Sequence, residues 1–144
     1  MSAQRQAHKF FLDARIEADT INVAKLALCQ IRLMNDCRFP WLVLVPQRRD
    51  ATEIFDLKQE DQSICYQEIS LISRMLKQAT GCDKINIAAF GNMVPQLHIH
   101  IVARNQTDPA WPDSAIGFGT REAYTPDAAA AMVTKIRQVI GTSH

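Results

Sequence analysis

The sequence lacks any long hydrophobic run. Its apolar stretches, such as Trp41-Leu42-Val43-Leu44-Val45, are far shorter than the roughly 20 residues that a membrane-spanning helix requires. The N-terminal stretch MSAQRQAHKFFLDARIEAD contains no apolar segment of signal-peptide length. We therefore expect a cytoplasmic protein with no membrane partner.

The chain also lacks a large excess of charge of either sign. Lysine and arginine number 16 against 15 acidic residues, which gives a formal net charge of +1. Such a balance provides no general electrostatic attraction to nucleic acid. The four cysteines form no C-x-x-C pair, and a chain of 144 residues can bury a core without cross-links. We expect reduced thiols, no nucleic-acid partner, and one domain over residues 1–144.

In the segment QLHIHIVAR, residues 96–104, polar and apolar residues alternate strictly up to Ile101. This pattern predicts a half-buried strand, because successive side chains of a strand point to opposite faces. The expected core face consists of Leu97, Ile99, Ile101 and Ala103. The opposite face carries Gln96, His98, His100 and Arg104, together with Val102. Histidine is scarce, with four in the chain, yet two of them share this face.

Three interpretations of the histidine pair follow from the pattern alone. Alternate residues on one strand face lie roughly 6 to 7 Å apart, so both imidazoles can contact one small group. They could act on a phosphate, or they could bind a metal with a further ligand such as Asp36 or Cys37. The third interpretation is an ordinary amphipathic strand whose histidines face solvent. Periodicity does not distinguish among the three.

The remaining patterns predict an α+β fold, in which an antiparallel sheet is covered by one long helix and accompanied by a C-terminal helix. Asp56 followed by Gln59 resembles a capping box at the start of the long helix, and Gly81 follows its last periodic residue. Thr125 is the expected N-cap of the C-terminal helix. The expected elements are two short strands within residues 20–34, strands at 39–45 and 84–90, and helices at 56–80 and 126–141.

The turn at Gly91-Asn92 is expected to pair the strand at 84–90 with the histidine strand as an antiparallel hairpin. The turn would then lie beside His98 and His100. Residues 105–125 are rich in turn formers and predict a long loop.

The segment NMVPQLHIH, followed by Arg104, resembles the signature of the histidine triad (HIT) superfamily. That signature reads His-φ-His-φ-His-φ-φ, where φ is apolar, and an arginine often follows. Gln96 stands at the first triad position, His98 at the second and His100 at the third. A bacterial branch of the superfamily carries glutamine at the first position. With the chain length and the order of elements, the resemblance spans roughly residues 10–112 and identifies a single HIT-like domain.

The resemblance implies a nucleotide hydrolase or nucleotidyl transferase that acts at an α-phosphate. Dinucleoside polyphosphates or nucleoside phosphoramidates are the implied substrates. His98 would attack phosphorus and form a covalent nucleotidyl-histidine, since a neutral imidazole is a competent nucleophile near pH 7. His100 would contact non-bridging oxygens or assist the leaving group. The resemblance also implies a homodimer and no cofactor.

Further site residues follow from the same resemblance. A ribose contact is implied for Asn35 or Asp36, and phosphate contacts are implied for Asn86, Asn92 and Arg104. Gln96 departs from the triad, because an amide can position a phosphate but cannot titrate. Loss of proton transfer typically costs about 10²–10⁴-fold in rate. Two alternatives therefore stay open: a nucleotide-binding regulatory domain with weak or no turnover, and a metalloprotein that uses the HxH pair.

Overall fold

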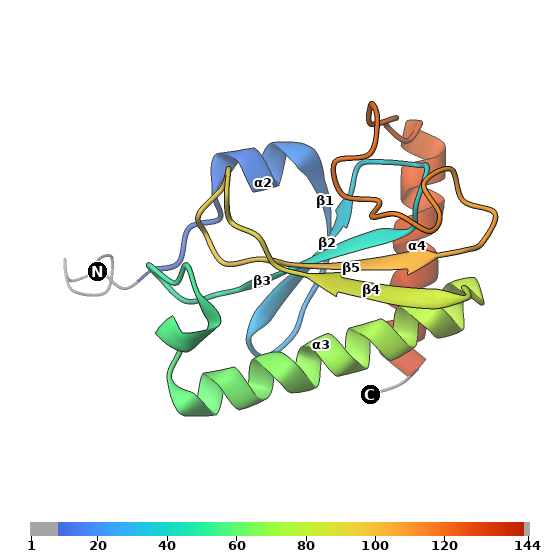
Figure 1. The fold of residues 1–144 in the computed structure, drawn as a ribbon. Helices are drawn as coiled ribbons and strands as arrows, with labels where there is room; N and C mark the ends of the chain where they lie inside the picture. The colour runs from blue at the N-terminus through green and yellow to red at the C-terminus, as the bar shows by residue number, and fades with distance from the viewer. Residues whose placement is uncertain (1–8, 143–144) are drawn as a thin grey trace.

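Five strands with alternating or continuous apolar residues form one antiparallel sheet in the order β1-β2-β3-β5-β4. The computed structural model describes residues 9–142. The strands are β1 (Thr20–Lys25), β2 (Cys29–Met34), β3 (Trp41–Pro46), β4 (Lys84–Ala88) and β5 (Ile99–Arg104). Helix α3 (Gln59–Thr80) lies beneath the sheet, and the short helix α2 (Ala14–Asp19) lies above it (Figure 1). This arrangement confirms the predicted α+β fold.

One face of the sheet packs against α3 and the C-terminal helix α4 (Pro126–Thr142). The helices present apolar stripes to it, which is the pattern expected of helices that cover a sheet. Each fully buried aliphatic side chain contributes about 1.5–3 kcal/mol relative to exposure. Members of this core with at most 2% exposure include Ile31, Leu33, Leu42, Leu44, Ile72, Leu76, Ile99, Ile101 and Ile136.

The other face of the sheet is buried as well. Ile16 of α2 and two alanines of the loop after β5, Ala110 and Ala115, cover a second apolar cluster. Sheet residues in that cluster are Trp41, Val43, Val45 and Val102. Every residue of β3 and β5 is buried, which explains why β3 is a continuous apolar run.

The two faces predicted for the histidine strand are confirmed. Ile99 and Ile101 lie in the core beneath the sheet, whereas Val102 lies in the cluster above it. The strand itself is shorter than predicted, because β5 begins at Ile99. Gln96 and His98 therefore lie in the connection from β4, residues 89–98. That connection is longer than the short hairpin turn expected, although β4 and β5 do pair antiparallel.

The predicted start of α3 was wrong. Asp56 ends a separate 3₁₀ turn, η1 (Ile54–Asp56), and its carboxylate accepts hydrogen bonds from the backbone N–H groups of Thr52 and Glu53. The expected pairing of Asp56 with Gln59 is therefore absent, and α3 begins at Gln59. The predicted end is confirmed: Gly81 adopts φ +65, a left-handed conformation that glycine accepts without a steric cost.

The N-cap predicted for α4 is confirmed, since Thr125 Oγ1 accepts a hydrogen bond from Ala128 N–H at 3.3 Å. The helix runs to Thr142, one residue beyond the predicted end at 141. Residues 105–125 contain no helix or strand, in agreement with the predicted loop. Within residues 9–142, no helix is long and apolar enough to cross a membrane.

Candidate functional site

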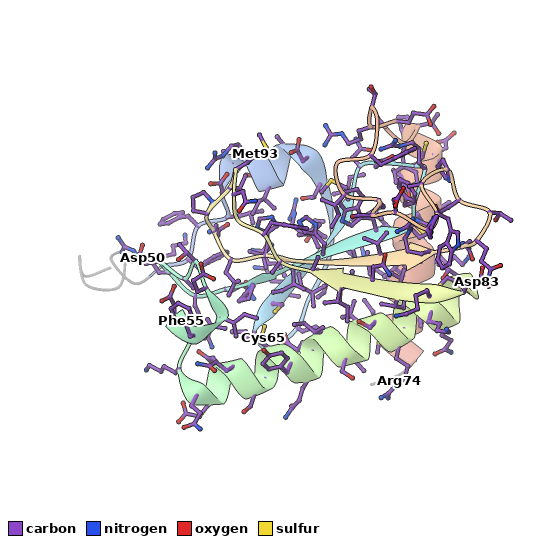
Figure 2. The ribbon with its side chains drawn as sticks, in the orientation of Figure 1. Asp50, Phe55, Cys65, Arg74, Asp83 and Met93 are labelled. Atoms are coloured by element: carbon purple, nitrogen blue, oxygen red, sulfur yellow. The ribbon has the colours of Figure 1, made fainter. Side chains whose placement is uncertain are left out.

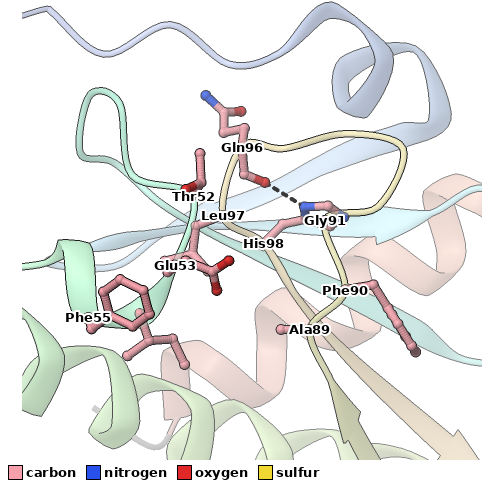
Figure 3. A pocket seen from close by; sticks show the side chains of 10 residues that line it. Thr52, Glu53, Phe55, Ala89, Phe90, Gly91, Gln96, Leu97 and His98 are labelled. Atoms are coloured by element: carbon pink, nitrogen blue, oxygen red, sulfur yellow. Dashed lines mark hydrogen bonds between the residues drawn. The ribbon is translucent and has the colours of Figure 1, made fainter.

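His98 lies at the end of the β4–β5 connection with its ring held by the backbone. Its Nδ1 is 2.7 Å from the carbonyl oxygen of Gln96, a contact drawn as a dashed line in Figure 3. Because a carbonyl only accepts hydrogen bonds, Nδ1 must carry the proton. The neutral ring therefore has its lone pair on Nε2, the arrangement that a nucleophilic imidazole requires.

His100 lies on β5 with the opposite proton arrangement. The indole Nε1–H of Trp41 donates to His100 Nδ1 at 3.1 Å. An indole N–H only donates, so Nδ1 is the acceptor and Nε2 carries the proton. Burial, with a smaller contribution from His98, lowers the pKa of His100 to about 4. His100 is therefore neutral near pH 7.

The two imidazoles are neighbours, as their spacing predicted. Their ring centroids are 5.0 Å apart and their planes meet at 76°. Phe90 lies beside them, with its ring centroid 6.1 Å from that of His100. The pair is chemically asymmetric, because His98 presents a lone pair and His100 presents an N–H. One group that attacks phosphorus and one that binds a phosphate oxygen is a combination suited to phosphoryl chemistry.

Two clefts open beside His98. The first has a volume of about 170 Å³ and lies between η1 and the β4–β5 connection (Figure 3). Thr52, Glu53, Phe55 and Phe90 line it together with His98. The second, about 270 Å³, is mostly apolar and reaches both histidines. Its other lining residues are Phe90, Gly91, Asn92, Met93, Val94 and Ile116.

Gln96 also lines the first cleft, but its amide is not free. Its Oε1 accepts from the backbone N–H of Asp13 at 2.8 Å, and its Nε2 donates to the carbonyl of Phe11 at 2.8 Å. Both hydrogen-bonding groups of the amide are thus used to hold residues 11–13. The same residue provides the carbonyl that orients His98. Gln96 therefore anchors the His98 loop, a role that the sequence pattern did not indicate.

A second contact joins the same two segments. Arg15 Nη1 donates to the carbonyl of Met93 at 2.9 Å, and Met93 lies beside α2 in Figure 2. Within the loop, Gly91 adopts φ +80, a conformation that favours glycine. Asn92 follows it and lines the apolar cleft, so it lies where a phosphate contact was predicted.

Asp36 lies in a third cleft, of about 210 Å³, whose lining includes Met34, Trp41 and Phe118. Its carboxylate is bound by Arg38 at 2.8 Å. Burial acts to raise the pKa of Asp36, but hydrogen bonds from Arg38 prevail and hold it below its usual value.

Asn35 does not line this cleft. Its Oδ1 accepts a hydrogen bond from the backbone N–H of Tyr124 at 2.9 Å. Of the two predicted ribose contacts, only Asp36 lines this cleft.

Arg104 and Asn86 lie apart from both clefts beside His98. The guanidinium of Arg104 is 1% exposed, forms two hydrogen bonds with Asp108 at 2.8 and 3.0 Å, and donates to Asn86 Oδ1 at 2.9 Å. It also packs against the rings of Phe39 and Trp111. Arg104 thus pairs with both Asn86 and Asp108, and neither Arg104 nor Asn86 lines a cleft beside His98.

The residues proposed as metal ligands do not converge. Across residues 9–142, no three histidine, cysteine or acidic side chains form a group that could bind a metal ion. Both Nδ1 atoms of the pair already have hydrogen-bond partners, and the Asp36 carboxylate is paired with Arg38. The geometry therefore gives the metalloprotein interpretation no support.

Comparisons with known proteins concern the family and the fold of the chain. The family profile described as HIT domain matches residues 15–107. A histidine triad protein of Sinorhizobium meliloti 1021 is 47% identical, with a TM-score of 0.88 over 90% of this chain and 96% of that one. One from Bradyrhizobium japonicum is 42% identical (TM-score 0.89; 92% and 98% covered). One from Marinobacter aquaeolei VT8 is 39% identical (TM-score 0.90; 93% and 98% covered). No curated protein matches the chain.

Proposed function

Because the chain belongs to the histidine triad (HIT) family, we propose that it is a nucleotide hydrolase or nucleotidyl transferase whose nucleophile is Nε2 of His98. The observation that carries the proposal is the 2.7 Å hydrogen bond between His98 Nδ1 and the Gln96 carbonyl. It fixes the tautomer whose lone pair is on Nε2, beside two clefts.

The reaction proceeds in two displacements at the α-phosphorus. Nε2 of His98 forms a bond to phosphorus while the bond to the leaving group breaks, and the leaving group departs with the electron pair. Water, or another acceptor, then displaces the histidine and restores its lone pair. His100 donates its Nε2–H to a non-bridging oxygen, and loss of one such donor typically costs about 10²–10³-fold in turnover.

The proposed substrate is a dinucleoside polyphosphate or a nucleoside phosphoramidate. We assign the phosphate to the space beside His98, His100 and Asn92. The nucleoside is assigned to the cleft that contains Asp36, where Trp41 is the connecting residue because it lines that cleft and hydrogen bonds to His100. Gln96 contributes indirectly, because it anchors the loop that carries His98.

The test is capture of the covalent intermediate. Wild-type protein is mixed with nucleotide labelled at the α-phosphate, quenched in base, where a phosphoramidate survives, and analysed for acid-labile label. We expect label on the wild type and none on His98→Ala. His100→Ala is the matched control, because it removes the neighbouring imidazole but keeps the nucleophile, and it should be labelled more slowly. Unchanged turnover by His98→Ala would exclude the proposal.

A second candidate function is nucleotide binding with little turnover. The observation that favours it is Gln96, which cannot carry a proton to the leaving group and is committed to residues 11–13. This function predicts saturable nucleotide binding by calorimetry with no product over hours. Accumulation of labelled intermediate followed by product release would reject it.

We also propose a cytoplasmic homodimer. Among the strands of residues 9–142, β4 is an edge that pairs with β5 alone, and its neighbourhood exposes Ile87 (53%) and Phe90 (55%). Unpaired edges and exposed apolar side chains favour association. The free thiols of all four cysteines suit a reducing compartment. Sedimentation should show a dimer that Ile87→Lys converts to a monomer, and a monomeric wild type would contradict the proposal.

A further inference from the structure

We propose that Trp41 is a positioning residue that holds His100 as a neutral hydrogen-bond donor toward the phosphate. The inference rests on the proposed function but concerns a residue that no triad motif contains. Its basis is the direct contact between the buried indole of Trp41 and the buried ring of His100.

Strand pairing and burial fix the relative position of the Trp41 and His100 rings. In the β3–β5 pairing, Val43 faces His100 and Trp41 faces Val102. Trp41 and His100 are therefore diagonal neighbours on the same face of the sheet. Both are 7% exposed, and their ring centroids are 5.6 Å apart with planes at 63°. Strand register and burial together place the indole N–H against Nδ1.

This placement selects one of three possible states of His100. With a proton on Nδ1, in either the other neutral tautomer or the imidazolium, two N–H groups would face each other across 3.1 Å. The indole N–H would then be buried without an acceptor, which is unfavourable. The remaining state has Nδ1 free and the proton on Nε2. Trp41 thus determines which atom of His100 can donate.

The selection gives the two histidines different tasks. His98 donates from Nδ1 to a backbone carbonyl and keeps a lone pair on Nε2, whereas His100 accepts at Nδ1 and donates from Nε2. If His100 took the other tautomer, its Nε2 lone pair would face the phosphate oxygens and repel them. The contact with Trp41 therefore keeps His98 as the nucleophile and His100 as the hydrogen-bond donor.

The surroundings of His100 reinforce the neutral state. Its cross-strand neighbours are Val43 on β3 and Ala88 on β4, and Phe90 contacts its ring. The titratable group that acts on it is His98. Burial first, and then His98, lowers the pKa of His100 to about 4. Its donor role should consequently be constant from about pH 5 upward.

The test uses Trp41→Phe, which keeps an aromatic ring in the β3 position but removes the N–H donor. Trp111→Phe is the matched control, because it makes the same exchange at the other tryptophan of the chain. Nitrogen-15 NMR of the histidine rings should show His100 protonated on Nε2 in the wild type and in Trp111→Phe. In Trp41→Phe we expect a mixture of the two neutral tautomers, because the donor that selects one of them is gone.

The turnover rate should depend on which tautomer His100 adopts. We expect kcat of Trp41→Phe to fall roughly 10- to 100-fold with KM nearly unchanged, because part of the population still donates correctly. A purely structural role would not alter the ring nitrogens, and circular dichroism establishes that the variant is folded.

Two results would overturn the inference. One is an unchanged His100 tautomer in Trp41→Phe, and the other is a changed tautomer with unchanged kcat. Covalent labelling of His98 is measured on the same preparations. Absence of label on the wild type would reject the proposed function itself, whereas slower labelling of Trp41→Phe alone supports the role of Trp41.

Discussion

The amide of Gln96 should stabilise the docking of residues 11–13, and Gln96→Ala tests this. The change removes two hydrogen bonds, each of 2.8 Å, to Asp13 N–H and Phe11 O. A hydrogen bond contributes about 0.5–1.5 kcal/mol net, so both contribute about 1–3 kcal/mol. Since about 1.4 kcal/mol corresponds to tenfold, the docked state of this segment should become roughly 5- to 150-fold less favoured.

Amide hydrogen exchange measures this opening directly. The Asp13 N–H, which donates to Gln96, should exchange faster in Gln96→Ala by roughly the factor above. Amides of the buried core helix around Ile72 should change far less, because the opening is local. Gln67→Ala is the control, since it makes the same truncation at an exposed position of α3.

Gln96→Glu provides a second test of the anchoring role of the Gln96 amide. One carboxylate oxygen can still accept from Asp13 N–H, but the other would replace the amide donor that faces the carbonyl of Phe11. The protonated carboxyl restores a donor, so docking raises its pKa above the ordinary value of about 4.3. Stability from this contact should be present below about pH 4 and lost as pH rises through the raised pKa. Unchanged Asp13 exchange in Gln96→Ala would refute the anchoring role.

Three further perturbations test the surroundings of the site. Asp108→Ala leaves the buried cation of Arg104 without its partner, and urea titration should show a loss of about 3–5 kcal/mol. Hydrogen bonds from Arg104 lower the pKa of Asp108 to about 2. This contribution to stability should hold above about pH 4 and disappear as pH falls toward 2, which acid titration followed by circular dichroism will show. Gly81→Ala forces a side chain into φ +65 where no atom lies within 4 Å; strain alone should lower the free energy of unfolding by about 1–2 kcal/mol.

The order of elements and the histidine pair could be predicted from the sequence. Strict alternation around His98 and His100 determined which side chains share a face, because strand periodicity is a local property of the backbone. Apolar stripes located the long helix in the same way. The tautomer of His98 depends on a backbone carbonyl two residues away in the chain and needs no distant partner.

What could not be predicted depends on contacts between distant segments. Periodicity shows that a side chain leaves one face of a strand, but not what covers that face. Arg104 was expected at a phosphate, yet the loop after β5 encloses it with Asp108.

Gln96 meets Asp13 across 83 positions of the chain, and Trp41 meets His100 across 59. These partners are chosen by strand register and by the packing of α2 and the loop over the sheet. Tertiary structure therefore decided the proton position of His100, and with it that the two histidines carry their protons on different nitrogens.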